Sequence, residues 1–404
     1  MYKVAIIGAG VGGSYLSYRL AKYGLDTIIF DFRAPHEKLC GGGISYKALA
    51  QFPVLQELPC PRKVVWKAAF ISPKNRTLIL ELARPLTIFK RRDLDSSLLT
   101  RAQELGVHFR REKVRSFTLM GDHWKIVTDR GEYRAEKLVG ADGALSRTRR
   151  KLQQTYQRGE LFFALQCFLP VQEDVVTYKF FPELQGYLWA FPRIGTLAIG
   201  IVTKDPTREN YRDMRKKLLS FIERYYPGKT KGISLRGAYI PFFSAGDLSA
   251  GRICSDSWAL IGDAARFVDP ISGEGMYYAL SSAEILASCI RENELPLYQG
   301  LCREGFGSNL IKASQSFHYV YQPEFLEAMT AMAARSAPVR RIVCEMIEGD
   351  LNYLTWKGRF RSKLVRIAAD FILKSDMLTK REVMGDLLKL RLPRLRPYPK
   401  VKIS

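Results

Sequence analysis

The sequence predicts an α/β protein in which a parallel-sheet domain is interleaved with a mixed β-sheet domain and followed by a helical C-terminal region. Three observations predict this fold class. The chain opens on an apolar run followed by Gly8-x-Gly10-x-x-Gly13, the pattern of a strand, a tight turn and a helix. Aromatic and β-branched residues dominate from about 160 to 245. A second strand, glycine turn and helix follow over 258–280, which indicates a return to the first domain.

The N-terminal glycine turn predicts a Rossmann-like dinucleotide site. In such a turn Gly8, Gly10 and Gly13 have separate tasks: one shapes the turn, one admits a pyrophosphate and one lets the helix pack on the strand. The anion then lies at the N-terminus of the helix. A second apolar strand ends at Asp31, ~20 residues beyond the glycines, where a carboxylate can accept hydrogen bonds from a ribose.

The order of these segments predicts the domain organisation. We expect the first domain to occupy residues 1–160, with inserted strands near 60–90, and to resume over 251–295. The β-sheet domain between its two parts, 161–250, is expected to hold the substrate. A basic helical region completes the chain over 296–404.

The loop after Asp31 is a further candidate site. It contains Cys40 followed by Gly41, Gly42 and Gly43. Consecutive glycines cost conformational entropy, so they indicate that the backbone passes close to a flat or bulky group. Cys40 could be a buried free thiol beside a flexible turn or a thiol that faces a cofactor ring, and the spacing alone favours neither.

The next segment is expected to form a hairpin and a helix. Residues 64–82 read as two strands around a Pro-Lys-Asn turn. The helix that follows could be capped by Asp93 or Asp95, and Gly106 ends it. Arg91, just before this helix, could neutralise a phosphate or could be a solvated charge.

Two later strand ends carry an aspartate beside a glycine. Asp142 lies in Ala-Asp-Gly, where a carboxylate could touch a second polar part of a nucleotide, although Asp-Gly is also a common turn. A later apolar strand ends at Gly262 and Asp263. Gly273 and Gly275 then precede a helix, so backbone amides and the helix dipole could meet an anion or an electron-rich ring edge.

The β-sheet domain contains an aromatic strand, Tyr187-x-Trp189-x-Phe191-Pro192. Alternate residues of a strand share a face, so the three aromatic side chains should form one wall. Judged by residue type alone, such a set more often forms the core of a sheet than the wall of a binding site.

The charge of the chain restricts its partners. It has 63 Lys and Arg against 40 Asp and Glu, a net charge of +23, which attracts anionic partners. The sequence has no zinc-finger pairing, no RNP-like signature and no basic low-complexity tail, so we do not expect nucleic acid. An anionic membrane surface is the expected partner.

Other patterns bear on location and metal binding. No stretch approaches ~18 uninterrupted apolar residues, so a membrane-spanning helix is not expected. The first strand stands where a cleavable signal would lie. The cysteines and histidines are scattered, which suits reduced thiols and predicts no metal site. We expect a cytoplasmic protein that is peripheral to the membrane.

An amphipathic helix is expected over 361–375. Its apolar face lies opposite a basic one, with Leu364, Val365, Ile367, Ala368, Phe371 and Ile372 against Arg361, Lys363, Arg366 and Lys374. Such a helix could lie on a membrane surface, or it could pack on the domain with a solvated basic back. The pattern leaves both interpretations open.

Taken together, the first motifs resemble the FAD-binding pattern of the para-hydroxybenzoate hydroxylase-like flavoproteins. The resemblance covers most of the first 290 residues, and Arg91 matches the Arg-x-x-Leu element of that group. It implies FAD, with the pyrophosphate on the N-terminal glycines, the adenosine ribose on Asp31, and the ribityl and pyrophosphate region on Asp263. The implied cofactor-binding residues are Gly8, Gly10, Gly13, Asp31, Cys40, Gly41, Gly42, Arg91, Asp142, Gly262, Asp263, Gly273 and Gly275.

Two further stretches, KLCGGGIS and GYLWAFPR, resemble the Cys-Gly-Gly loop and the Tyr-x-Trp-x-Phe-Pro motif of the geranylgeranyl reductase family. That family saturates prenyl double bonds of chlorophyll, archaeal membrane lipids or quinones. The resemblance implies catalytic roles for Cys40, Tyr187, Trp189 and Phe191, and a substrate site formed by the three aromatic residues with Pro192. Arg193 stands where the family usually has lysine, and the two differ in geometry.

The implied activity is FAD-dependent reduction of C=C bonds in a geranylgeranyl or other prenyl chain. An isolated alkene accepts hydride poorly, so protonation should accompany hydride transfer, and aromatic faces would stabilise the positive charge that develops. Cys40 is the candidate acid. The external donor would be NAD(P)H or a carrier protein such as ferredoxin, and the basic surface favours an acidic carrier.

Two alternatives remain at this point. The same fold serves FAD-dependent monooxygenases and halogenases that act on aromatic or lipophilic substrates, and a halogenase also needs a lysine in its tunnel. The third interpretation is a flavoprotein that binds lipid or membrane without turnover, which the net charge alone would favour.

Overall fold

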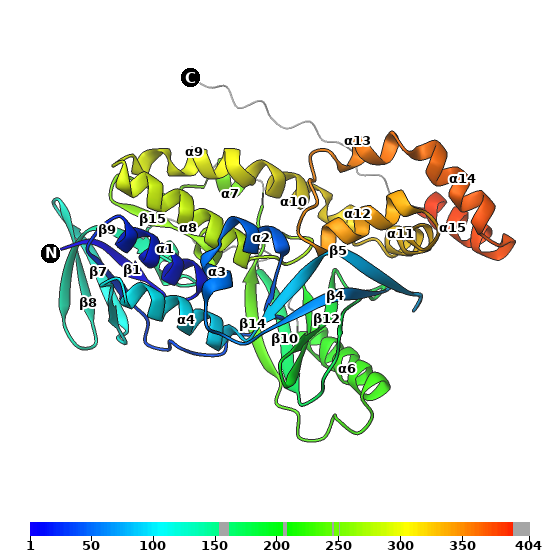
Figure 1. Cartoon of the computed structure of the whole chain (residues 1–404), viewed down its shortest axis with the longest axis horizontal. Helices are drawn as coiled ribbons and strands as arrows, with labels where there is room; N and C mark the ends of the chain where they lie inside the picture. The colour runs from blue at the N-terminus through cyan, green and yellow to red at the C-terminus, as the bar shows by residue number, and fades with distance from the viewer. Residues whose placement is uncertain (153–160, 205–207, 245, 250, 391–404) are drawn as a thin grey trace.

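Two β-sheets lie side by side, and helices cover both of them (Figure 1). The computed structural model describes residues 1–152, 161–204, 208–244, 246–249 and 251–390. The domain boundary expected near residue 160 and the last part of the expected C-terminal region, 391–404, lie outside the described residues.

The first sheet carries the N-terminal glycine turn. Its strands are β1 (Tyr2–Ile7), β2 (Thr27–Phe30), β6 (His108–Arg110), β7 (Val114–Met120), β8 (His123–Thr128), β9 (Glu132–Gly140) and β15 (Trp258–Leu260). The order is β6–β2–β1–β9–β8–β7, and β15 also pairs with β9. Val4, Ala5 and Ile6 of β1 are fully buried, as expected for a parallel strand covered on both faces.

Helices pack around this sheet and order its glycine turns. They are α1 (Val11–Lys22), α2 (Tyr46–Gln51), α3 (Val54–Glu57), α4 (Arg91–Gln103), α5 (Arg147–Leu152), α7 (Gly246–Ser249), α8 (Met276–Arg291) and α9 (Tyr298–Cys302). Helix α1 packs against α4 and α8. Because β15 pairs in parallel with β9, the chain re-enters the first sheet after it has completed the second.

The expected cap of α4 is wrong. The helix begins at Arg91, with Lys90 at the capping position, so Asp93 and Asp95 both lie within it. Asp95 is one turn beyond Arg91 and binds the Arg91 guanidinium, which explains why this acid is internal to the helix.

The second sheet carries the aromatic strand. Its strands are β3 (Gly43–Ile44), β4 (Arg62–Ile71), β5 (Thr77–Phe89), β10 (Leu161–Leu169), β11 (Val175–Lys179), β12 (Gly186–Arg193), β13 (Thr196–Thr203) and β14 (Arg236–Pro241). The order is β14–β10–β13–β12–β11–β4–β5–β3. The strands expected near 60–90 extend this second sheet, because β4 pairs in parallel with β11.

The two faces of the second sheet bury different clusters. Helix α6 (Arg208–Tyr225) packs on the face that includes Leu188 and Ala190 of β12. The face that includes Trp189 is covered by α10 (Ser308–Val320), α11 (Pro323–Arg335) and α12 (Ala337–Ile347). Alternation along β12 therefore separates a structural core from the side on which α10–α12 lie.

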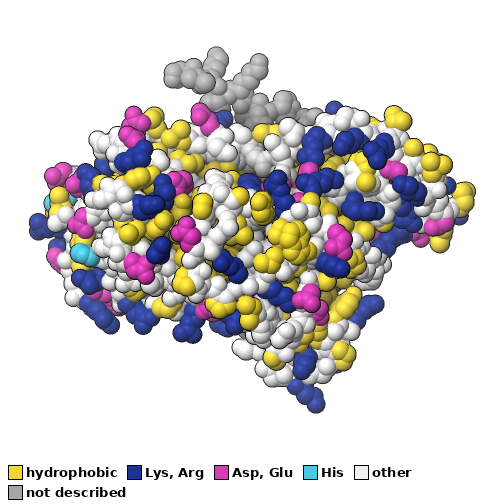
Figure 2. All heavy atoms as spheres, viewed as in Figure 1, with side chains coloured by type: hydrophobic (Ala, Val, Ile, Leu, Met, Phe, Trp, Pro, Cys, Tyr) yellow, Lys and Arg dark blue, Asp and Glu magenta, His cyan; other side chains and the backbone are white. Residues whose placement is uncertain are grey.

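The C-terminal end of the described chain is helical and basic. It consists of α13 (Trp356–Arg361), α14 (Leu364–Lys374) and α15 (Met377–Lys389). Lys and Arg side chains gather over these helices (Figure 2). None of the helices in the described part of the chain combines the length and the apolar character needed to cross a membrane.

A buried charge cluster joins α5, α7 and the turn after β15. Arg149 donates through Nη1 to the carbonyl of Ala264 at 3.1 Å and through Nη2 to Asp247 at 3.3 Å. Arg266 donates to the same Asp247 oxygen at 2.9 Å. All three charged side chains are at most 5% exposed, so the Asp247 carboxylate balances two guanidinium groups away from water.

The cluster generates the first prediction. Replacing Asp247 with alanine leaves two buried guanidinium groups without this carboxylate, so we expect the free energy of unfolding to fall by about 3–5 kcal/mol, measured by urea denaturation. Asp122→Ala is the control, because Asp122 pairs with His123 at an exposed site and its loss should leave the midpoint unchanged. Equal midpoints for Asp247→Ala and the unmodified protein would contradict the assignment.

Candidate active site

One continuous cavity connects the glycine turns of the first sheet to the aromatic strand of the second. Its empty volume is about 1920 Å³, including the opening to solvent, against ~300–1,000 Å³ for a typical small-molecule site. One end is lined by backbone and charged groups, among them Gly10, Gly12, Lys38, Arg91, Gly143 and Asp263. The other end is lined by apolar side chains, among them Leu86, Phe162, Tyr178, Phe180, Tyr187, Trp189, Val202, Ile240, Tyr321 and Met346.

The three N-terminal glycines differ in what surrounds them. Gly8 has φ +109°, and a Cβ there would lie 2.3 Å from the carbonyl oxygen of Ala141. A Cβ on Gly13 would lie 1.9 Å from the carbonyl oxygen of Gly8. A Cβ on Gly10 would meet nothing within 4 Å, and Gly10 lines the cavity. Gly8 and Gly13 thus permit close packing, and Gly10 presents bare backbone to the cavity.

Two aspartates of the expected cofactor site lie in the frame of the cavity. Asp31 accepts hydrogen bonds from the amides of Ala9 at 3.0 Å and Arg33 at 2.9 Å, so its carboxylate fixes the glycine turn against the end of β2. Asp142 accepts from the amides of Arg147 at 2.8 Å and Thr148 at 3.0 Å at the start of α5. The loop of Asp142 lines the cavity with its neighbours Ala141 and Gly143.

Arg91 and Cys40 lie together in the cavity wall. Arg91 is buried, so the interpretation as a solvated charge is wrong. Its Nε and Nη2 donate to Asp95 at 3.1 and 2.9 Å. Burial disfavours the guanidinium charge, but Asp95 and the adjacent Cys40 thiol hold the pKa of Arg91 above its ordinary value. The Cys40 sulfur also accepts a hydrogen bond from the amide of Gly42 at 3.3 Å.

The flat group that the three glycines admit is the ring of Phe191. A Cβ on Gly41 or Gly43 would lie 2.6 or 2.8 Å from ring carbons of Phe191. Gly42 has φ +86°, and a Cβ there would lie 2.1 Å from the carbonyl oxygen of Phe89. Any larger residue would push the loop away from the aromatic strand.

Arg193 and Gln166 hold the same loop, and sequence reasoning assigned neither this task. Buried Arg193 donates to the Glu37 carboxylate at 2.5 Å and to the carbonyl oxygens of Cys40 and Gly41. Gln166 of β10 donates to the carbonyl of Cys40 at 3.2 Å. These contacts are long-range in sequence, so no local pattern could have found them.

The aromatic strand lines the cavity with Tyr187, Trp189 and Phe191. The Tyr187 hydroxyl donates to the carbonyl of Ser272 at 2.6 Å. The Trp189 ring lies over Gly200 of β13, where a Cβ would be 2.2 Å from the indole. Pro192 does not line the cavity, because alternation turns it toward the opposite face of β12.

The second glycine turn faces the cavity from the other side. Asp263 forms an ion pair with Lys38 at 2.7 Å, and both side chains line the cavity with Gly262. Gly273, at φ +73°, passes under the Tyr187 hydroxyl. Gly275 also lines the cavity and occupies the capping position of α8. The N-terminus of α8, with its partial positive charge, thus adjoins the cavity.

Glu274 is a site residue that sequence reasoning missed. It lies between Gly273 and Gly275 in the cavity wall and accepts a hydrogen bond from Ser45 Oγ at 2.9 Å. Burial raises the pKa of its carboxyl to about 7, although the ammonium of Lys47 acts in the opposite direction. Its position inside a glycine turn hid it, since the glycines themselves carried the signal.

The residues at the polar end fit an FAD molecule. Helices α1 and α8 both begin without a side-chain cap and without an acidic residue in the first turn, so their N-terminal amides can bind an anion. In the described part of the chain, Gln166 Oε1 and Trp189 Nε1 are buried without a hydrogen-bond partner, and both residues line the cavity. Unpaired buried polar atoms in a cavity wall indicate that a ligand completes the site.

Comparisons with known proteins agree with this geometry. A scan against protein-family models finds no match. An uncharacterized protein of Methanosarcina barkeri is 30% identical over 302 residues, 72% of this chain and 74% of that protein. The geranylgeranyl diphosphate reductase of Synechocystis sp. is 27% identical over 316 residues, 71% of this chain and 75% of that enzyme.

The solved structures that match share the fold. A geranylgeranyl bacteriochlorophyll reductase-like protein of Thermoplasma acidophilum matches with a TM-score of 0.73 at 21% identity, over 89% of this chain and 98% of that one. The halogenase PltM with FAD bound matches with a TM-score of 0.65 at 16% identity, over 96% and 95%. The predicted fold class, a Rossmann-like FAD-binding domain interleaved with a mixed β-sheet domain and followed by helices, is confirmed. The chain belongs to the geranylgeranyl reductase family of FAD-dependent oxidoreductases.

Proposed function

We propose that this enzyme reduces carbon–carbon double bonds of a prenyl chain held in the apolar end of the cavity. The observation that carries the proposal is the continuity of the cavity from the FAD-binding turns to a compartment walled by aromatic and aliphatic side chains. A linear hydrocarbon needs apolar contact along its length and offers no hydrogen bonds, so this wall suits it.

The tyrosines of the compartment support an apolar ligand. Tyr187 donates its hydroxyl hydrogen to the carbonyl of Ser272, and Tyr321 donates to that of Ile271, both at 2.6 Å. Because both hydroxyl groups are bound to one loop of the protein, the rings can meet the ligand with their apolar faces. Aromatic faces also stabilise a positive charge that develops on a tertiary carbon.

FAD in its reduced form, when bound, supplies the hydride equivalent for one carbon of the double bond, and a nicotinamide or an electron-carrier protein restores it. The second carbon needs a proton from the protein. Glu274 is the residue suited to hold it, since its carboxyl lies in the cavity wall with a pKa of about 7. An apolar ligand that excludes water would favour the protonated carboxyl further.

A halogenase or monooxygenase is less well supported. Among the described residues that line the cavity, Lys38 is the only lysine, and it is paired with Asp263 at the polar end. The apolar compartment therefore lacks a described lysine of the kind that a halogenase needs in its tunnel.

Trp189 provides a direct test. We expect Trp189→Ala to slow the anaerobic reoxidation of reduced flavin by a geranylgeranylated lipid or diphosphate about 30-fold, the loss of a desolvated cation–π contact of ~2 kcal/mol. The measurement follows flavin absorbance and product mass together, and hydrogen added to the prenyl chain identifies the reaction.

Trp66→Ala is the matched control, because Trp66 lies exposed on β4 and does not line the cavity. Reduced flavin that persists with every prenyl substrate until air is admitted, followed by oxygen consumption coupled to product, would establish the monooxygenase alternative. Full activity of Trp189→Ala on a verified substrate would reject the aromatic stabilisation.

The pH dependence tests Glu274. Its carboxyl must be protonated to donate, so we expect the single-turnover rate to be constant below about pH 7 and to fall about tenfold per pH unit above it. Glu274→Gln keeps an oxygen that can accept from Ser45, lowers the rate about 10²-fold or more and removes this dependence.

Cys40→Ala separates the two candidate acids. If Glu274 is the donor, Cys40→Ala retains the pH dependence of the rate even where the rate itself changes. A pH profile that disappears in Cys40→Ala and persists in Glu274→Gln would assign the proton to the thiol instead.

A further inference from the structure

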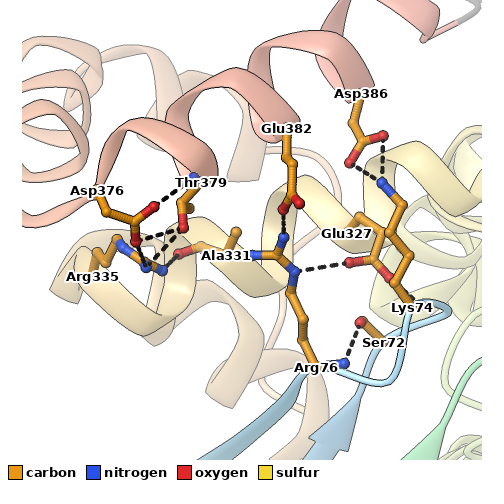
Figure 3. Close-up of polar contacts among 10 residues, drawn as sticks. All are labelled: Ser72, Lys74, Arg76, Glu327, Ala331, Arg335, Asp376, Thr379, Glu382 and Asp386. Atoms are coloured by element: carbon orange, nitrogen blue, oxygen red, sulfur yellow. Dashed lines mark hydrogen bonds and ion pairs between the residues drawn. The ribbon is translucent and has the colours of Figure 1, made fainter.

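Helix α15 has the reverse orientation of an ordinary surface helix, because its polar face is bound to the protein (Figure 3). Asp386 pairs with Lys74 at 2.9 Å, and Glu382 pairs with Arg76. Asp376 lies 3.8 Å from Arg335 of α11. Lys74 and Arg76 come from the turn between β4 and β5, so acids spaced along one side of α15 hold it against the second sheet and α11.

The opposite face of α15 is apolar and exposed. Met377, Leu378, Met384 and Leu388 are between 58% and 81% exposed. Helix α14 continues this surface with Val365 at 86% and Leu373 at 82%. Large aliphatic side chains are rarely this exposed in groups, and such a patch marks an interaction site. We define the docking surface as Val365, Leu373, Met377, Leu378, Met384 and Leu388.

Cations flank the docking surface. Residues 356–390 contain nine Lys and Arg against four Asp and Glu. Three of the acids are those that bind α15 inward, and the fourth, Asp370, pairs with Lys374 at 2.7 Å. Arg361, Lys363, Arg381 and Lys389 are exposed and have no carboxylate partner within the described residues. The same end of the molecule shows basic and apolar side chains side by side in Figure 2.

We propose that this surface docks the protein on an anionic lipid bilayer. Apolar side chains that enter the acyl boundary, flanked by Lys and Arg that meet anionic headgroups, are the combination by which an amphipathic helix binds a membrane surface. A second copy of the chain fits less well, because a two-fold interface would bring the same cations together.

The docking surface adjoins the part of the fold that holds the compartment. Ile367 of α14 is buried in the same apolar cluster as Trp189 and Phe162, with Val343 of α12. The helix that would lie on the bilayer is thus packed, through its other side, on the cluster behind the cavity. The docking itself does not depend on the proposed reaction, since it follows from the surface alone.

The experiment is co-sedimentation with vesicles. We expect the full chain to bind vesicles of equal parts phosphatidylglycerol and phosphatidylcholine, to bind phosphatidylcholine alone much less, and to be released by salt. The double variant Val365→Ser with Leu373→Ser should lower the partition coefficient about tenfold or more. Arg361→Gln with Lys363→Gln should lower it about 30-fold for the anionic vesicles only.

The matched control removes exposed apolar side chains elsewhere. Leu119→Ser with Met120→Ser changes β7, at the opposite end of the molecule from α14 (Figure 1), and should leave vesicle binding unchanged. Flavin content and melting temperature confirm that each variant is folded. Vesicle binding by Val365→Ser with Leu373→Ser equal to that of the unmodified chain would overturn the proposal. So would a dimer in sedimentation velocity that this variant dissociates, because a second copy would then be the occupant.

Discussion

The buried guanidinium of Arg193 holds the two halves of the candidate site together. Its fork contacts the Glu37 carboxylate and the carbonyl oxygens of Cys40 and Gly41, and no other side chain bridges the loop to β12 in this way among the described residues. Phe191, on the same strand, packs against Gly41 and Gly43. Lysine carries its charge at one point and could not serve three acceptors in this fixed geometry. The position of Cys40 relative to the aromatic wall therefore depends on arginine at this place.

Features that follow from local chemistry could be predicted from the sequence. The first glycine turn needs one residue at positive φ and one close helix–strand contact, and Gly8 and Gly13 meet those needs within a few residues of each other. The period of two in β12 likewise placed Tyr187, Trp189 and Phe191 on one face. The family followed from how these motifs combine, since each alone is common.

Features that depend on contacts between distant segments could not be predicted. Glu274 has an unusual pKa because several elements bury it, and Ser45, which binds it, is 229 residues away in the chain. Asp142 looked like a ligand contact because its glycine neighbour resembles a binding turn, yet the amides of α5 compete for its carboxylate and bind it. The same limit applies to α15, where the direction of the apolar face depends on Lys74 and Arg76 from the β4–β5 turn.

The orientation of α15 is costly in water, which is the strongest physical reason to expect a partner. Ion pairs near the surface contribute about 0–1 kcal/mol each, and those of Lys74 and Arg76 are only partly buried. Burying a leucine or methionine is worth about 1.5–3 kcal/mol relative to exposure, and α15 leaves Met377, Leu378 and Leu388 exposed. Rotating the helix would therefore gain free energy in an isolated molecule, apart from the cost of releasing its buried acids. A bilayer removes this conflict, because it covers the apolar face while the acids keep their cations.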